Sequence, residues 1–280
     1  MPAINAIAAD KFARLVGTPQ CPAIVDIRSD AEHAGEPRFI PGALRRALAA
    51  TPGWAGDFAG RSVVVVGQAG GAPDHGVAAW LRQAGADAEI LDGGLRGWAA
   101  AGLPLVDASA VPPRDGAGRT LWVTRARPKV DRIACPWLIR RFVDPTALFL
   151  FVPAAEVPGV AAQMGATPFD VEGEGVRWTH RGDLCTFDAM VAGFGLGGVA
   201  PLARLAPIVR GADTARPDLA PEAAGLLAMS LGLSRLHGDD LAQLDAGMAV
   251  YDALYRWCRD ATGETHDWAS HQPARPRGPA

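Results

Sequence analysis

Short apolar runs alternate with helical patterns over the first hundred residues. Residues 24–27 and 63–66 are rich in β-branched side chains and are bounded by turn residues. Such runs are typical of strands buried on both faces of a parallel sheet. Helical spacing over residues 77–84 then leads to a third short strand at 88–91, which completes a right-handed βαβ unit. We therefore predict a parallel-sheet α/β domain over residues 4–106.

The second half of the chain has a mainly helical pattern, and we predict an α+β domain over residues 120–262. Between the two domains, residues 107–119 are rich in proline, glycine and small side chains, which indicates an interdomain linker. The last residues, 263–280, show no periodicity and are expected to form a flexible tail. Strands are expected at 121–124, 148–152 and 176–179, and helices at 131–143, 186–194, 199–210, 221–236 and 239–259.

Composition and charge limit the function. A chain of 280 residues fits two domains. With 27 basic and 30 acidic residues, no global basic field exists to bind nucleic acid. The most apolar long window, 191–209, is broken by Arg204 and two prolines, so no membrane span is expected. The first twelve residues lack a signal-peptide pattern, and the cysteines lack Cys-x-x-Cys spacing. We expect a cytoplasmic protein with reduced thiols.

Several stretches of the first domain resemble the rhodanese family. They are Asp26-Ile27-Arg28 with Glu32 downstream, residues 40–43 (IPGA), and residues 91–94 (LDGG) followed by Trp98. Rhodaneses carry a reactive cysteine at the end of the central strand, and that position aligns with Gly67 here. The resemblance therefore implies a pseudo-sulfurtransferase that is kept for docking a protein partner. Two alternatives are a glycine-rich loop that still cradles a small oxyanion, and a sulfurtransferase or sulfur carrier.

A dense group of charges follows the first strand of the second domain. Forked guanidinium groups beside a helix N-terminus suit a tetrahedral oxyanion. A thiol near cations can have a lowered pKa and act in catalysis or sensing, so Cys135 is the candidate catalytic residue. The alternative is a solvated basic turn with an N-capping carboxylate and a buried cysteine. The predicted ligand-binding residues are Arg125, Arg127, Lys129, Asp131 and Arg132.

A second group of residues has the chemistry of metal ligands. His180 lies at the end of an expected strand, Asp188 in the first turn of the next helix, and Glu222 at the start of a later helix. Imidazole and carboxylate groups bind divalent transition metals, but the spacing matches no known zinc motif. These three residues define an alternative function, a metal-dependent enzyme of unknown substrate. The residues themselves leave open whether the chain is an enzyme.

Five stretches of the second domain carry a second resemblance. They are 125–142 (RARPKVDRIACPWLIRRF), 179–190 (THRGDLCTFDAM), 208–213 (IVRGAD), 221–236 (PEAAGLLAMSLGLSRL) and 248–258 (MAVYDALYRWC). With these stretches the domain resembles the C-terminal domain of the chromate resistance protein family ChrB. The resemblance implies a bacterial, chromate- or oxyanion-responsive protein linked to chromate resistance. Some family members carry an N-terminal DNA-binding domain, whereas this chain has the rhodanese-like domain at that end, so no nucleic-acid partner is expected.

Overall fold

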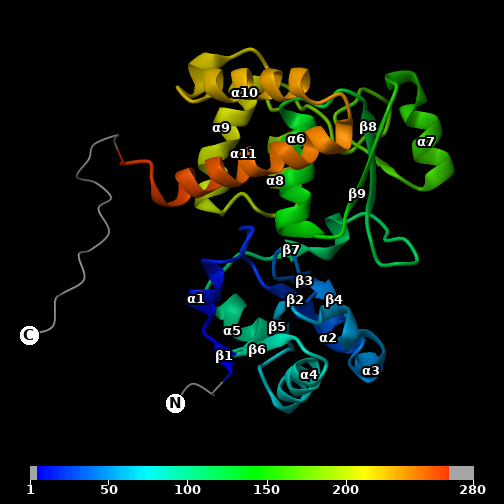
Figure 1. The fold of residues 1–280 in the computed structure, drawn as a ribbon, viewed down its shortest axis with the longest axis vertical. Coiled ribbons are helices and arrows are strands. Elements are labelled where there is room, and N and C mark those ends of the chain that lie inside the picture. Colours follow the sequence, from blue (N-terminus) through cyan, green and yellow to red (C-terminus); the bar gives the residue numbers. More distant parts are fainter. Residues whose placement is uncertain (1–4, 265–280) are drawn as a thin grey trace, which may run out of the picture.

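The computed structural model describes residues 5–264, and in it the chain forms two bodies that lie end to end (Figure 1). The smaller body is built on a parallel sheet of five strands in the order β1-β6-β5-β2-β4. This sheet confirms the predicted α/β class of the first domain. The strands are β1 (Ala6–Ile7), β2 (Ala23–Asp26), β4 (Leu44–Arg45), β5 (Ser62–Val66) and β6 (Asp87–Leu91).

Helices cover both faces of this sheet because successive strand residues point to opposite sides. Val64 and Val66 of β5 pack into one apolar core, and Val63 and Val65 pack into the other. The first face is covered by α1 (Ala9–Ala13) and α5 (Gly94–Ala100), and the second by α3 (Thr51–Trp54) and α4 (Ala72–Gln83). The short helix α2 (Asp30–Gly35) starts at a capping box formed by Ser29 and Glu32.

The larger body combines a small parallel sheet, in the order β10-β8-β9, with a set of helices. Its helix α6 ends five residues before the predicted end, and the chain continues through one wider π-helical turn over Ile139–Val143. The elements are β8 (Leu121–Arg125), β9 (Leu148–Val152), β10 (Thr167–Pro168), α6 (Asp131–Leu138), α7 (Val157–Met164), α8 (Thr186–Gly193), α9 (Ala200–Asp213), α10 (Ala223–Leu236) and α11 (Asp240–Asp260).

The strand predicted at residues 176–179 is absent, and an isolated bridge between Phe169 and Trp178 stands in its place. The Trp178 side chain is buried and stacks on Phe194, with their ring centroids 4.6 Å apart. The segment is apolar because the aromatic side chain of Trp178 is buried, and this burial does not require a strand.

The segment 107–119 connects the two bodies and is tied to both of them. Its first residue belongs to β7 (Val106–Asp107), which pairs antiparallel with β3 (Arg38–Phe39) in the smaller body. Farther on, the Arg114 guanidinium lies 3.1 Å from the buried Asp144 carboxylate of the larger body. The linker is therefore attached to the smaller body by strand pairing and to the larger body by an ion pair.

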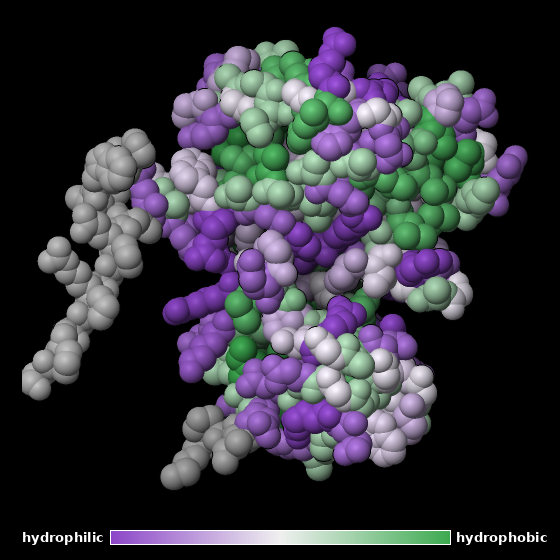
Figure 2. All heavy atoms as spheres, viewed as in Figure 1, coloured by the Kyte–Doolittle hydropathy of each residue, from purple (hydrophilic) through white to green (hydrophobic). Residues whose placement is uncertain are grey.

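The two bodies share one apolar core. Phe142, at the end of the π-helical turn, packs directly against Gly17 of the smaller body. The backbone N–H of Gly42 donates a 2.8 Å hydrogen bond to the carbonyl of Phe142. Figure 2 shows that hydrophilic side chains cover much of the waist between the bodies on the face in view.

Within the residues that the structure describes, no helix is both long and apolar enough to cross a membrane. Most of the tail predicted at 263–280 lies outside the described residues, because the description ends at Glu264.

Candidate functional site

Four polar side chains from separate elements meet at one end of the small sheet. Nε2 of His180 lies 3.1 Å from Oδ2 of Asp213, 3.5 Å from Oδ1 of Asp170 and 3.7 Å from Oδ2 of Asp131. Asp131 opens α6, Asp170 follows β10, His180 precedes α8, and Asp213 ends α9. One ligand atom each from Asp131, Asp170 and His180 can be chosen so that all three lie within 4.8 Å of one another. We call the four residues the acidic cluster.

Asp131 lies deepest in the acidic cluster and is fully buried. Its Oδ2 accepts a 3.2 Å hydrogen bond from the backbone N–H of Phe187, but its Oδ1 has no hydrogen-bond partner. Burial, and then the nearby charges of Asp213 and Asp170, raise the pKa of Asp131 well above its ordinary value. An orphaned buried carboxylate oxygen is unusual in a folded protein and calls for a functional explanation.

His180 is the half-exposed member of the acidic cluster. Its hydrogen bond to the Asp170 carboxylate raises the pKa of the imidazole to about 9, although burial opposes this shift; the charges of Asp131 and Asp213 also raise it. Without another cation in the cluster, the imidazole is therefore protonated at neutral pH. The cluster is an environment that attracts positive charge.

The backbone around the acidic cluster is strained. Five non-glycine residues within 5–264 have positive φ, and four of them lie in or beside the cluster: Arg127 (59°), Val130 (35°), Asp170 (50°) and Ala215 (57°). For a β-branched residue such as Val130 this conformation is a genuine outlier. Strain of this kind persists where the surroundings enforce it, and it gathers at ligand sites.

The later helices hold the strained turn in place. Val130 donates its N–H to Oγ of Ser230 at 2.9 Å, and its carbonyl accepts a hydrogen bond from the Tyr251 hydroxyl, also at 2.9 Å. The Gln243 side chain donates to the carbonyl of Pro128. Thus α10 and α11 position the start of α6, and with it Asp131.

The predicted cations have different surroundings. Arg132 and Arg125 lie 3.2 and 3.5 Å from Oδ2 of Asp170. The Arg127 guanidinium instead donates to the backbone carbonyls of Ser234 and His237, so it is committed to the turn between α10 and α11. The exposed ammonium group of Lys129 forms no ion pair within residues 5–264.

A surface cavity of about 490 Å³ opens onto the acidic cluster. Among the five predicted ligand-binding residues, Arg125 alone lines it, with half of its side chain exposed. Other lining residues are Ala154, Asp170, Val171, Glu172, Thr179 and His180.

Cys135, the predicted catalytic thiol, is fully buried in the middle of α6. Burial raises its pKa well above the ordinary value, and the charges of Asp131 and Asp170 raise it further. The sequence pattern suggested a thiol beside cations with a lowered pKa. In the fold, its electrostatic neighbours are carboxylates, so the thiol stays protonated.

The predicted metal ligands are distributed over different surroundings. His180 belongs to the acidic cluster, whereas Asp188 caps α8 by accepting the N–H of Cys185 at 3.1 Å and pairs with Arg210 at 3.3 Å. Glu222 stands just before α10, close enough to the Cys258 thiol to raise its pKa, although burial contributes more to that shift.

Sequence reasoning passed over Asp170 as a site residue and named Asp213 only as the end of the stretch 208–213. The position of Asp170 just after β10 is the feature that could have indicated it as a site residue. Because β10 runs parallel to β8, both strands end at the same edge of the sheet, where α6 also begins.

Comparison with known families agrees with this architecture. Residues 8–101 match the rhodanese-like domain family, and residues 122–258 match the C-terminal domain of ChrB. The chain therefore contains a rhodanese-like domain and a ChrB C-terminal domain, which confirms both resemblances predicted from its motifs.

A curated relative is Protein ChrB of Cupriavidus metallidurans. It is 40% identical over 159 residues, which cover 55% of this chain and 46% of that protein. The chain thus spans about half the length of the curated relative it matches.

Solved structures resemble the smaller body. A rhodanese-like domain protein from Staphylococcus aureus is 28% identical, with 34% of this chain and 91% of that chain covered and a TM-score of 0.30. A protein from Staphylococcus saprophyticus is 25% identical, with 36% and 99% covered and a TM-score of 0.32. Thiosulfate sulfurtransferase from Pseudomonas aeruginosa is 23% identical, with 38% and 20% covered and a TM-score of 0.31. TM-scores this low add no argument to the family match.

Proposed function

We propose that this chain takes part in bacterial chromate resistance and that its ChrB C-terminal domain binds a divalent transition-metal cation in the acidic cluster. The resemblance to ChrB supports the physiological role. The orphaned Oδ1 of buried Asp131 is the observation that carries the metal proposal.

The chemistry of the cluster favours a cation. A buried carboxylate oxygen without a partner is costly, and a metal ion supplies the missing interaction. Carboxylates together with one imidazole suit divalent metals such as Mn²⁺, Fe²⁺ or Zn²⁺. Asp170 also has outer contacts that would orient it, because its Oδ1 accepts a 2.9 Å hydrogen bond from the Thr186 hydroxyl.

The cavity beside the cluster also provides a place for an oxyanion. The Arg125 guanidinium lines this cavity together with His180, and a bound cation would add positive charge next to it. A cation and a forked guanidinium together can hold a tetrahedral dianion such as chromate. The oxyanion contact in this proposal is Arg125, because its side chain is half exposed and lines the cavity, although it also lies 3.5 Å from Asp170.

The rhodanese-like domain has a non-catalytic role in this proposal. Gly67 follows the central strand β5, where a sulfurtransferase needs a thiolate. Such a domain serves to dock a protein partner, consistent with the loss of chemistry on a retained fold.

Isothermal titration of chelator-treated protein with Mn²⁺ and with Zn²⁺ tests the metal site. The wild type is expected to bind one cation per chain, and Asp131→Asn is expected to weaken binding at least about 100-fold, because a direct ligand is lost. Asp245→Asn, an exposed aspartate on α11, is the matched control and should leave affinity unchanged.

Equal affinity for the cation in wild type and Asp131→Asn would contradict the proposed metal site.

Titration of chromate into metal-loaded protein tests the proposed oxyanion contact. Arg125→Ala is expected to lower chromate affinity about tenfold, as loss of one charge-assisted contact predicts, while cation binding is retained. Chromate binding that ignores this change would contradict the oxyanion contact.

A further inference from the structure

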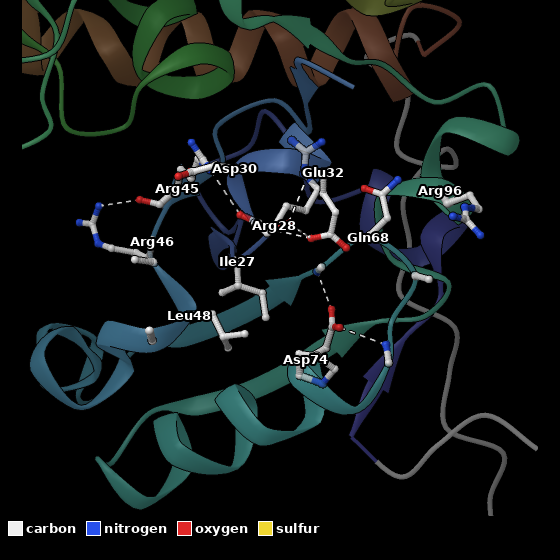
Figure 3. Close-up of a pocket in the computed structure, with 17 residues that line it drawn as sticks. Ile27, Arg28, Asp30, Glu32, Arg45, Arg46, Leu48, Gln68, Asp74 and Arg96 are labelled. Atoms are coloured by element: carbon white, nitrogen blue, oxygen red, sulfur yellow. Dashed lines mark hydrogen bonds and ion pairs between the residues drawn. The ribbon is translucent and has the colours of Figure 1, made fainter. Parts of the chain in front are cut away.

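An aspartate of the smaller body occupies the loop where rhodaneses carry their reactive sulfur. Asp74, in the first turn of α4, turns its carboxylate back toward the end of β5 (Figure 3). Its Oδ1 accepts the N–H of Gly67, and its Oδ2 accepts the N–H of Gly71 at 3.0 Å. The residue is only 3% exposed. Two N–H groups of this loop are therefore already hydrogen-bonded to a carboxyl group that the chain itself supplies.

The same carboxylate excludes any side chain at position 67. A Cβ atom placed on Gly67 would lie 2.6 Å from both carboxylate oxygens of Asp74. This separation is far below van der Waals contact, and Asp74 is a short side chain fixed by two hydrogen bonds. A cysteine at position 67 and Asp74 in its present place are thus mutually exclusive.

The cavity above the loop otherwise keeps features that suit an anion. It encloses about 780 Å³, and the guanidinium groups of Arg45, Arg46 and Arg96 line it (Figure 3). The rim carries these arginines together with the carboxylates of Asp30 and Glu32, and Asp30 pairs with Arg45. The Asp74 carboxylate already accepts the backbone N–H groups at the floor.

We infer that Asp74 is a built-in anion that closes the rhodanese-like pocket to sulfur donors and small oxyanions. The N–H groups that would hold such a ligand are taken, and a second negative charge beside the Asp74 carboxylate is repelled. This inference rests on the proposed non-catalytic role of the domain. It gives a second reason why the domain cannot transfer sulfur: restoring the missing thiol at position 67 would not by itself restore the reaction. Oxyanion binding is thereby restricted to the ChrB C-terminal domain.

Removing both obstacles predicts a defined reaction. In a protein carrying Gly67→Cys and Asp74→Ser, the introduced thiolate attacks the sulfane sulfur of thiosulfate. The sulfur–sulfur bond of thiosulfate breaks, sulfite leaves with the electron pair, and a persulfide remains on the protein. The freed N–H groups and the N-terminus of α4 stabilise the thiolate and the persulfide.

Four variants of the full-length, chelator-treated protein test the inference: Asp74→Ser, Gly67→Cys, the two combined, and Asp57→Ser as a control at an exposed aspartate. In titrations with thiosulfate, Asp74→Ser is expected to bind at least about tenfold more tightly than wild type or control, because two N–H donors are freed. Persulfide formation, followed by intact-protein mass spectrometry, is expected to be at least about tenfold faster in the combined variant than in Gly67→Cys.

The inference is overturned if Asp74→Ser binds thiosulfate no better than wild type, or if Gly67→Cys alone reacts as fast as the combined variant. Asp74→Asn provides a second route if the serine variant unfolds. It keeps the size of the side chain and one acceptor but removes the negative charge, so it should bind thiosulfate more tightly than wild type and the Asp57→Ser control. Sulfur transfer by the wild-type protein would contradict the proposed non-catalytic role. It would not change the observation that a side chain at position 67 collides with the Asp74 carboxylate.

Discussion

Replacing Asp144 by alanine is expected to lower the free energy of unfolding by about 3–5 kcal/mol. This buried carboxylate accepts hydrogen bonds from the N–H and hydroxyl groups of both Thr120 and Thr146, at 2.7–3.0 Å, and pairs with Arg114 at 3.1 Å. Alanine would leave these donors without an acceptor. Urea denaturation of the full chain measures the loss, and Asp218→Ala, which removes an exposed ion pair, should change stability little.

The contribution of Asp144 should also depend on pH. Burial by itself would raise the pKa of this carboxyl, but the Arg114 charge and the hydrogen bonds from Thr120 and Thr146 outweigh burial and lower it below 3.8. A lowered native pKa stabilises the fold above the unfolded-state pKa, and this stabilisation is lost as the pH falls through the native pKa. The stability difference between wild type and Asp144→Ala should therefore shrink below about pH 4. A difference that stays constant down to pH 2 would contradict this assignment.

Gly17→Ala should lower the free energy of unfolding by about 2–4 kcal/mol, because the substitution disrupts the packing between the two bodies. Gly17 has a φ of +80°, which L-residues rarely adopt. In addition, a Cβ atom there would lie 2.3 Å from the ring of Phe142, and overpacking of this kind costs about 1–3 kcal/mol. Chemical denaturation of the full chain measures the sum.

Gly60→Ala separates the two causes. Gly60 has a similar φ of +74° but no atom within 4 Å of the added Cβ, so this substitution carries the backbone cost alone. Equal losses at Gly17 and Gly60 would mean that Phe142 moves aside easily and that the interface is loosely packed.

The elements that the sequence predicts well are those with strong periodicity or continuous apolar runs. The run 63–66 becomes the central strand β5, and the patterns at 221–236 and 239–259 become α10 and α11 within one or two residues. The segment 176–179 fails because one buried tryptophan gives a short segment the apolar character of a strand.

The candidate site is harder to predict because its chemistry depends on tertiary neighbours. Arg127 and Arg132 are close in sequence, yet one binds carbonyls of the α10–α11 turn and the other lies against Asp170. Asp170 and Asp213 come from distant segments, and only the packing of the helices against the sheet end brings them to His180. Local charge density therefore indicates the right region, but it does not reveal the carboxylates of Asp170 and Asp213 that lie beside these arginines and His180.

The core shared by the two bodies has a consequence for cooperativity. Domains with small polar interfaces can unfold in separate steps, but here Phe142 of the larger body packs against Gly17 of the smaller one, and one apolar core contains residues of both. The chain should therefore melt in a single calorimetric transition, and a cut at the boundary between the two families would expose apolar surface on each fragment. The two domains should then fold as one cooperative unit, although each belongs to a different sequence family.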